Sequence, residues 1–527
     1  MPFNSLQYAG FLLLVVAVYW LLQGHQAKRW LLLLASYGFY ASWDWRFTLL
    51  LLADSLVAFA AGRALGRTGD AQQRRRIVIA ALVFNLGVLA TFKYLDFFYG
   101  SFRDLADVFG LSPPHFVARL VLPVGISFFT FQTVAYVIDV YRRELDPCES
   151  PLTFLLFSSY FPHLLAGPIV RARRLIPQVE RPPSRINTTQ FTEGLELILI
   201  GLFQKVAVAD ALAPVTSRAF GAFSTSPGSV STANLWIGVI ASVIQFILDF
   251  AGYSNIARGT SKLLGIELPY NFRQPLTRSR NFQDFWRREH MTLMAWFRDY
   301  VYRPLHDRRA PRWRNQAALL VVFALSGLWH GASWVWVTWG FLMGGVLITE
   351  IEVRRVLAQR RERRAPGGPT TGPVILGAAD VTDAPAGTSP ATGPDTAGPL
   401  AQAEATARAS APATRLIDQQ WVRAVYIILL AAVQVAWIRT GAISQSLDLY
   451  RHLLVPSGHG LDIDALMLLG YAVVALVLVD ARQVTMEERE ARPDPVTTLR
   501  AAGFGAMVLF IIVFSGEAPQ PFVYFQF

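Results

Sequence analysis

The stretch AALLVVFALSGLWHGASWVWVTWGFLMGGVLI, residues 317–348, holds 32 consecutive positions without Lys, Arg, Asp or Glu. As one α-helix it would be about 48 Å long, because each residue adds about 1.5 Å, whereas the hydrocarbon core of a bilayer is about 30 Å thick. Both flanks are basic: 13 Lys or Arg lie in residues 253–316 and six arginines lie in residues 354–364. Since basic loops favour the cytoplasm, we expect this stretch to enter the membrane and return, with its turn at 327–333.

The composition of the whole chain agrees with a polytopic membrane protein. Of 527 residues, 53% are apolar and only 16% are charged, and the mean hydropathy is +0.35. Soluble domains cannot bury that much apolar surface. The single cysteine, Cys148, excludes an internal disulfide and a Cys-rich zinc or iron–sulfur site, and we predict no metal site. The net charge of +11 comes from short basic runs between apolar segments, so we predict loops of a membrane protein and no nucleic-acid partner.

Further apolar runs predict the other membrane helices. The runs lie at 8–22, 30–61, 77–92, 120–140, 194–212, 233–252, 422–438, 465–480 and 498–514. The run 30–61 is interrupted at 43–46, so we expect a hairpin there. Residues 152–170 are apolar but contain Pro162 and Pro168, which predicts a re-entrant segment, because broken backbone inside a membrane must be covered by protein or water. We therefore predict an all-α polytopic fold with roughly 10–12 spanning helices plus re-entrant segments.

Residues 366–414 are mostly Ala, Gly, Pro and Thr with few aromatics. Such a segment cannot bury enough surface to offset its ordering entropy, so we predict a disordered cytoplasmic loop without chemistry. The loop would divide one membrane core into residues 1–365 and 415–527. The candidate catalytic segments, 281–305 and 326–333, both fall in the first part.

Three of the eight histidines stand in apolar or aromatic surroundings, where a polar group needs a partner or a function. His330 lies in Ser326-Gly-Leu-Trp-His-Gly-Ala-Ser333, between two glycines that would let a substrate approach the backbone closely. Shielded from water, its imidazole should stay neutral, which is the form that a general base needs. The alternative is a histidine that is bonded within a helix turn. His163, in backbone broken by prolines, is expected to be structural.

Residues 281–300 alternate aromatic residues with arginines around His290, which predicts an amphipathic helix at the membrane interface. Such a helix is more often a surface anchor than a site. Its arginines could instead bind the phosphates of a cytoplasmic donor, because guanidinium groups make bidentate contacts with phosphate. The candidates are Arg287, Arg288 and Arg298.

Several other kinds of function have less support. The chain has no G-x-S-x-G, Walker A or H-E-x-x-H motif, which weakens serine hydrolase, ATPase and zinc protease assignments. Asp54, Asp139 and Asp249 lie near predicted spans, so an ion-coupled transporter is an alternative. A noncatalytic component of a polysaccharide-export complex would fit the long insert, but it would leave His330 without a purpose.

Four motifs follow one another along the chain: Pro123-Val-Gly-Ile-Ser-Phe-Phe-Thr-Phe-Gln132, His163-Leu-Leu-Ala-Gly-Pro-Ile-Val170, Asn281–Leu305 with Phe-Trp-Arg-Arg-x-His, and Ser326–Ser333 with Trp-His-Gly. A fifth is Phe522-Val-Tyr-Phe-Gln-Phe527. With these motifs the chain resembles the membrane-bound O-acyltransferase family, in particular its bacterial branch with the alginate O-acetylation membrane subunit and the D-alanyl transfer protein of teichoic acid. It departs from that branch at Glu289, where relatives tend to have an aromatic residue, and in the insert 366–414.

The resemblance implies a helical membrane fold with a central funnel or tunnel, His330 as the catalytic residue and His290 as the second site residue. It implies acetyl-CoA or another acyl thioester as a cytoplasmic co-substrate, with no permanently bound cofactor, and an acceptor on the opposite face. By analogy, an extracytoplasmic acetyltransferase partner passes the acetyl group to a polysaccharide at the inner membrane of a bacterial cell. Transfer of D-alanyl or of a longer acyl group by the same fold is the alternative.

Overall fold

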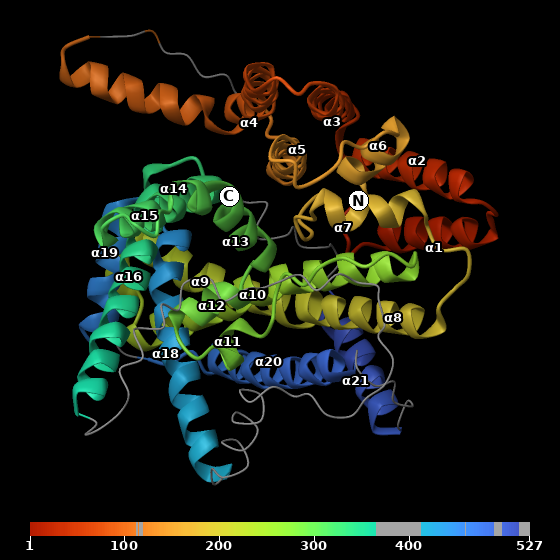
Figure 1. Ribbon diagram of the computed structural model, residues 1–527. Helices are drawn as coiled ribbons and strands as arrows, with labels where there is room; N and C mark the ends of the chain where they lie inside the picture. The colour runs from red at the N-terminus through yellow and green to blue at the C-terminus, as the bar shows by residue number, and fades with distance from the viewer. Residues whose placement is uncertain (112–113, 115–119, 365–412, 459, 490–497, 516–527) are drawn as a thin grey trace.

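The computed structural model describes residues 1–111, 114, 120–364, 413–458, 460–489 and 498–515, and every regular element in them is a helix (Figure 1). Seven of these helical stretches are long and apolar enough to cross a membrane. They are α3 (Arg46–Arg67), α4 (Ala71–Val108), α8 (Thr188–Leu202) continued by the π-helix η1 (Phe203–Asp210) and α9 (Ala211–Thr225), α10 (Thr232–Leu263), α16 (Trp334–Arg364), α18 (Ala413–Arg439) and α20 (Ile463–Arg489).

Shorter helices complete the described fold, and three of them, α1, α5 and α21, are also apolar. The bounds are α1 (Leu6–Leu21), α2 (His25–Asp44), α5 (Ile126–Tyr141), α6 (Pro151–Ser159), α7 (Ala172–Glu180), α11 (Pro275–Arg278), α12 (Phe282–Arg288), α13 (Met291–Phe297), η3 (Arg298–Tyr302), α14 (Arg303–Leu305), α15 (Arg312–His330), α19 (Ile443–Leu454) and α21 (Thr498–Phe514). The predicted all-α polytopic class is confirmed, whereas the number of 10–12 spans stays a prediction. The insert 366–414 and the motif 522–527 lie outside the described residues.

The apolar stretch 317–348 forms the helical hairpin that its length predicts. Helix α15 ends at His330, α16 begins at Trp334, and the two pack side by side. The contact is backbone to backbone, because a Cβ atom added at Gly327 would lie 2.1 Å from the carbonyl oxygen of Trp336. Small residues permit this closeness between membrane helices. The turn therefore falls inside the expected interval, immediately after His330.

Two other predicted breaks are also present. Helices α2 and α3 are separated at Trp45, within the interrupted run 30–61. Residues 152–170 form most of the short helix α6 and then a series of turns up to Gly167, and most of them are buried. This burial meets the requirement that irregular backbone at membrane depth be covered.

The prediction of one interfacial helix over residues 281–300 is wrong. The chain there forms two separate helices, α12 and α13, because His290 adopts a left-handed backbone with φ of 41° that no α-helix can continue. The aromatic residues that suggested a membrane-facing stripe are buried inside the protein: Phe282, Phe285, Trp286, Trp296 and Phe297. Hydrophobic periodicity records which residues avoid water, and it does not distinguish lipid from protein as their surroundings.

Helix α10 runs through the middle of the molecule and joins two apolar cores (Figure 1). The first core contains α1–α7 with the second half of α10, and the second core contains α9, α16, α18 and α20 with its first half. In the most apolar window of α10, 83% of the residues are buried. A helix that is apolar on every side is expected to be enclosed in this way.

Helix α8 crosses α10 at glycines spaced seven residues apart on each helix. A Cβ added at Gly201 would lie 2.5 Å from the carbonyl oxygen of Gly252, and one added at Gly259 would lie 2.5 Å from that of Gly194. The two backbones are therefore in direct contact, as in other small-residue crossings of membrane helices. This pair of helices fixes the position of α10 against which the candidate site is built.

Candidate functional site

The four sequence motifs meet in space. Gly125 has a φ of 78°, and a Cβ there would lie 2.6 Å from the carbonyl oxygen of Leu164, so the motif 123–132 packs directly on the motif 163–170. The backbone N–H of Ile169 donates to Thr292 Oγ1 at 2.9 Å. These contacts bring the segment 281–305 against the buried turns of 163–170.

The fourth motif joins the others through aromatic rings. Trp296 Nε1 donates to the carbonyl oxygen of Phe131 at 2.8 Å, and the two rings stack with centroids 4.0 Å apart. Phe128, on the same helix as Phe131, contacts both His290 and Trp329, at 6.3 and 5.9 Å between centroids. Segments more than 150 residues apart in the chain thus form one local environment.

His330 lies where the two apolar cores meet. Its ring is 4.9 Å from that of Trp329, which belongs to the first core, and 5.3 and 5.2 Å from those of Trp336 and Trp339, which belong to the second. The Trp336 ring stacks on the imidazole, with 16° between the planes. Three indoles therefore fix the orientation of the imidazole in a largely apolar setting.

The His330 side chain lines a partly open cavity. Side chains from α10, α12, α16 and α18 form its walls, and most of them are aromatic or aliphatic. The polar members of the lining are Glu289, His330 and Gln434. An apolar cavity with few convergent polar groups is the usual form of a small-molecule site.

His290 is fully buried and also contacts Trp329. Its Nδ1 lies 3.1 Å from Asn271 Oδ1, and its ring packs against those of Phe250 and Trp329, at 4.6 and 5.4 Å between centroids. Because Oδ1 is an acceptor, Nδ1 carries the proton and Nε2 the lone pair. Burial, and secondarily the nearness of His330, hold the pKa of His290 well below its ordinary value. The structure thus brings the two predicted histidines into one region, but only His330 lines the cavity.

The three candidate arginines lie in different places. Arg287 is exposed, and Arg288 bonds to Asp284 and to the carbonyl oxygen of Arg273. Arg298 is bound to Asp299, with Nε 2.9 Å from Oδ1. The structure therefore does not gather them into one group.

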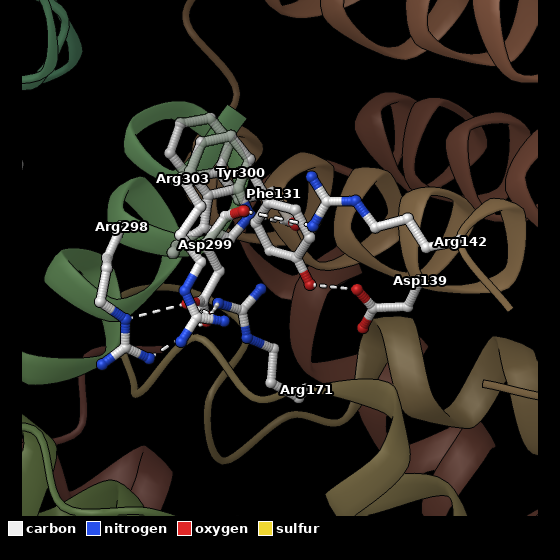
Figure 2. Close-up of polar contacts among 9 residues, drawn as sticks. Phe131, Asp139, Arg142, Arg171, Arg298, Asp299, Tyr300 and Arg303 are labelled. Atoms are coloured by element: carbon white, nitrogen blue, oxygen red, sulfur yellow. Dashed lines mark hydrogen bonds and ion pairs between the residues drawn. The ribbon is translucent and has the colours of Figure 1, made fainter. Parts of the chain in front are cut away.

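Arg298 belongs instead to an arginine cluster centred on Asp299 (Figure 2). The carboxylate of Asp299 also pairs with Arg171 at 3.0 Å and with Arg303 at 3.3 Å. The adjacent Tyr300 donates to Asp139 Oδ1 at 2.6 Å and lies under the Arg171 guanidinium, 4.2 Å from its ring centroid. The side chains of Arg298 and Arg303 stay 44% and 65% exposed, so this cluster presents positive charge to solvent.

The remaining polar residues that the sequence singled out have protein partners. Asp54 accepts from Thr133, Asp139 from Tyr300, and Asp249 pairs with Lys205 at 2.8 Å. These bonds give each carboxyl a structural role, which removes the observation that favoured an ion path. His163 Nδ1 lies 2.7 Å from the carbonyl oxygen of Tyr160 in its own turn.

Sequence reasoning missed Lys93, which bonds through Nζ to the carbonyl oxygen of Trp329 and lies 5.7 Å from the Trp329 ring. A signal was present, because Lys93 is the one basic residue in the apolar interval 77–102 and isolated charges in membrane segments are commonly functional. Glu289 was noted as a departure from the motif, but its place in the cavity lining was not foreseen.

Comparison with known proteins agrees with these observations. The model of the membrane-bound O-acyltransferase family (MBOAT) matches residues 141–369. A probable alginate O-acetylase, AlgI, of Azotobacter vinelandii is 35% identical over 345 residues, which cover 65% of this chain and 67% of the relative. A peptidoglycan O-acetyltransferase of Helicobacter pylori is 33% identical, over 60% of this chain and 63% of the relative.

A teichoic acid D-alanyltransferase of Bacillus subtilis is 32% identical, over 45% of this chain and 60% of the relative. The matched regions of the alginate relatives are about two thirds of their length. Acyl transferases need an acyl donor and an acceptor, and the several apolar helices place this one in a membrane. The chain therefore belongs to the membrane-bound O-acyltransferase family and is a multi-pass membrane O-acyltransferase.

Proposed function

We propose that this protein transfers an acetyl group from cytoplasmic acetyl-CoA across a bacterial inner membrane for the O-acetylation of an exopolysaccharide or cell-surface glycan. An extracytoplasmic acetyltransferase partner would deliver the group to the polymer. The observation that carries the proposal is the placement of His330 among three tryptophans at the wall of a cavity lined by residues of the second core. The similarity to an alginate and a peptidoglycan O-acetylating protein supports acetyl as the group and a glycan as the acceptor.

In this mechanism His330 is the general base. Its neutral imidazole takes the proton of the acceptor hydroxyl while that oxygen attacks the thioester carbonyl carbon. The carbon–sulfur bond then breaks, its electron pair leaves with the CoA sulfur, and the proton passes from the imidazolium to that thiolate. General base catalysis contributes about 10²–10⁴ in rate, and fixed placement in a cavity supplies much of the remainder.

His290 would orient the substrate or polarise its carbonyl from its position beside Trp329. Its Nδ1–H is held by Asn271, so Nε2 has a fixed direction. The arginine cluster around Asp299 would bind the donor's phosphates, because Arg298 and Arg303 retain exposed guanidinium groups. Arg287 and Arg288 lie outside this cluster.

The test is the amount of O-acetyl ester on surface polysaccharides of a deletion strain complemented with wild type, His330→Ala or His306→Ala. His306 is a partly exposed histidine in the loop after α14, outside the cavity lining, and serves as the matched control. We expect ester with wild type and the control and none with His330→Ala, at equal protein levels in the membrane. A wild-type amount of O-acetyl ester with His330→Ala would refute the assignment of His330 as the base. D-alanyl ester in place of acetyl ester would show that the donor carries D-alanine.

A further inference from the structure

Glu289 is an acidic residue in the wall of the same cavity. It follows the last residue of α12, and its N–H donates to the carbonyl oxygen of Phe285 at 2.9 Å. The left-handed backbone of His290 then separates the two neighbouring side chains. Glu289 lines the cavity with His330, whereas His290 bonds to Asn271. Glu289 therefore faces the cavity next to a residue with a strained backbone, and strain of this kind is concentrated at functional sites.

The Glu289 carboxyl has no partner among the residues that the structure describes. The residue is only 7% exposed, yet no cation lies within ion-pair distance and no donor bonds to its oxygens. The Nε2 of Gln434, in the same cavity wall, also lacks a hydrogen-bond partner in the described part of the chain. A buried polar group without a partner is destabilising, so two of them in the wall of one cavity indicate a bound group that satisfies them.

Charged groups on the surrounding elements are engaged elsewhere. On α12, Arg288 pairs with Asp284. On α16, Arg354 pairs with Glu350 at 2.8 Å. Each of these charges therefore has its own partner.

The same holds for the two helices that form the opposite wall. On α18, Arg439 donates to Gln245, and on α10, Asp249 pairs with Lys205.

Burial alone raises the pKa of Glu289 to about 8, so near pH 7 the carboxyl is mostly protonated. In that form it is a hydrogen-bond donor.

We propose that Glu289 is a further catalytic residue, whose protonated carboxyl donates a hydrogen bond to the carbonyl oxygen of the acyl group held in the cavity. The inference rests on the proposed function. As the acceptor oxygen attacks, the carbonyl double bond opens to an oxyanion, and the Glu289 O–H stabilises that charge. When the carbon–sulfur bond breaks, the carbonyl reforms and Glu289 keeps its proton. The proton that moves is the acceptor's, through His330.

This role differs from that of a carboxylate base or of a binding site for a cation. An ionised carboxylate would be needed for either, and the apolar lining disfavours that form. A neutral carboxylic acid that stabilises an oxyanion is chemically well suited to an apolar site, and one such donor is commonly worth about 10²–10³ in rate.

The experiment compares wild type, Glu289→Gln and Glu289→Leu in isolated membranes. It measures release of the CoA thiol from acetyl-CoA, with polysaccharide of the deletion strain as acceptor. Glutamine keeps an uncharged donor, whereas leucine fills similar space without one. We expect Glu289→Leu to lower kcat about 10²–10³-fold with little change in the KM for acetyl-CoA, and Glu289→Gln to keep at least a third of the activity.

The pH dependence of activity is a second measurement, and a purely structural role of Glu289 would not change it. The neutral form is the active one, so wild-type activity should fall as the pH rises through about 8, and Glu289→Gln should not show this fall. Thermal unfolding of both variants should match or exceed that of wild type, because each removes an uncompensated buried carboxyl. Loss of activity with leucine would then not reflect misfolding.

Three results would overturn the inference. If Glu289→Leu kept the wild-type kcat, Glu289 would make no hydrogen bond to the acyl carbonyl that matters for the rate. If both variants were equally inactive, the ionised carboxylate would be the required form. A pH profile unchanged in Glu289→Gln would show that another group titrates. If wild type itself transfers no acetyl, the proposed function fails, whereas activity that depends on His330 but not on Glu289 refutes this inference alone.

Discussion

Two buried acidic sites in this protein differ in how their charges are satisfied. Near the π-helix η1, Lys205 Nζ lies 2.7 Å from Asp210 and 2.8 Å from Asp249, so a cation stands between two carboxylates. In the His330 cavity, Glu289 has no such partner among the described residues. Buried charges that are mutually paired hold helices together, whereas an unpaired polar group at a cavity wall is available to a ligand. Both sites contain a buried acidic residue. A cationic partner within the protein indicates a structural role, and the lack of one at a cavity wall indicates a functional role.

The largest effect is expected in the cavity. His330→Ala should reduce acyl transfer about 10²–10⁴-fold, because it removes the base from a site where no other side chain of the lining can replace a neutral imidazole. The melting temperature should change little, since the imidazole faces a cavity. If His330→Ala lowered the melting temperature as strongly as the activity, His330 would have a structural role like that of the Lys205 site.

The paired site should respond in the opposite way. Lys205→Met removes the cation and leaves Asp210 and Asp249 buried together, which should destabilise the protein by about 3–5 kcal/mol. The measurement is thermal unfolding in detergent, with kcat normalised to the folded fraction. Arg451→Met is the control, because its partner Asp448 forms an exposed surface pair. A normal melting temperature with reduced kcat would assign Lys205 to the catalytic machinery.

A smaller loss of stability is expected at the glycine crossing of α8 and α10. Gly201→Leu places side-chain atoms where Gly252 O lies 2.5 Å from a Cβ, and overpacking of this kind costs about 1–3 kcal/mol. Gly221, which has nothing within 4 Å of its would-be Cβ, provides the control Gly221→Leu. If both variants unfold alike, the close crossing does not govern the stability of α10.

The smallest effect concerns donor binding at the arginine cluster. Arg298→Ala should raise the KM for acetyl-CoA several-fold with kcat nearly unchanged, since an exposed guanidinium contributes about 1 kcal/mol or less. The increase should diminish at high salt, because screening weakens exposed contacts. Arg287→Ala, at an exposed position outside the cluster, should leave KM unaltered. A larger increase in KM with Arg287→Ala than with Arg298→Ala would show that the donor's phosphates bind outside the cluster.

The sequence predicted those features that depend on length and composition. A 32-residue uncharged stretch is too long for one crossing, and the structure folds it at Gly331–Ser333. The broken backbone of 152–170 followed equally from its prolines. These inferences succeeded because chain geometry and the chemistry of unpaired backbone groups act locally.

The failures involve relations between distant residues. The left-handed conformation of His290 leaves no periodic signal, so the division into α12 and α13 was missed. The contact between Gly201 and Gly252 joins two helices whose separate sequences look ordinary. The cavity position of Glu289 depends on α10, α16 and α18 together, and the spacing within one segment cannot disclose it.

The central position of α10 has a consequence for biosynthesis. Gln245 on this helix is bonded by Arg439 on α18, a residue 194 positions later in the chain. At about 5–20 residues per second, a ribosome needs roughly 10–40 s to make the intervening chain. During that time α10 is complete, but Gln245 lacks its contact with Arg439 on α18. Membrane insertases and quality-control proteases would meet the protein in this half-assembled form, and variants that delay α18 should be degraded before they can be tested for activity.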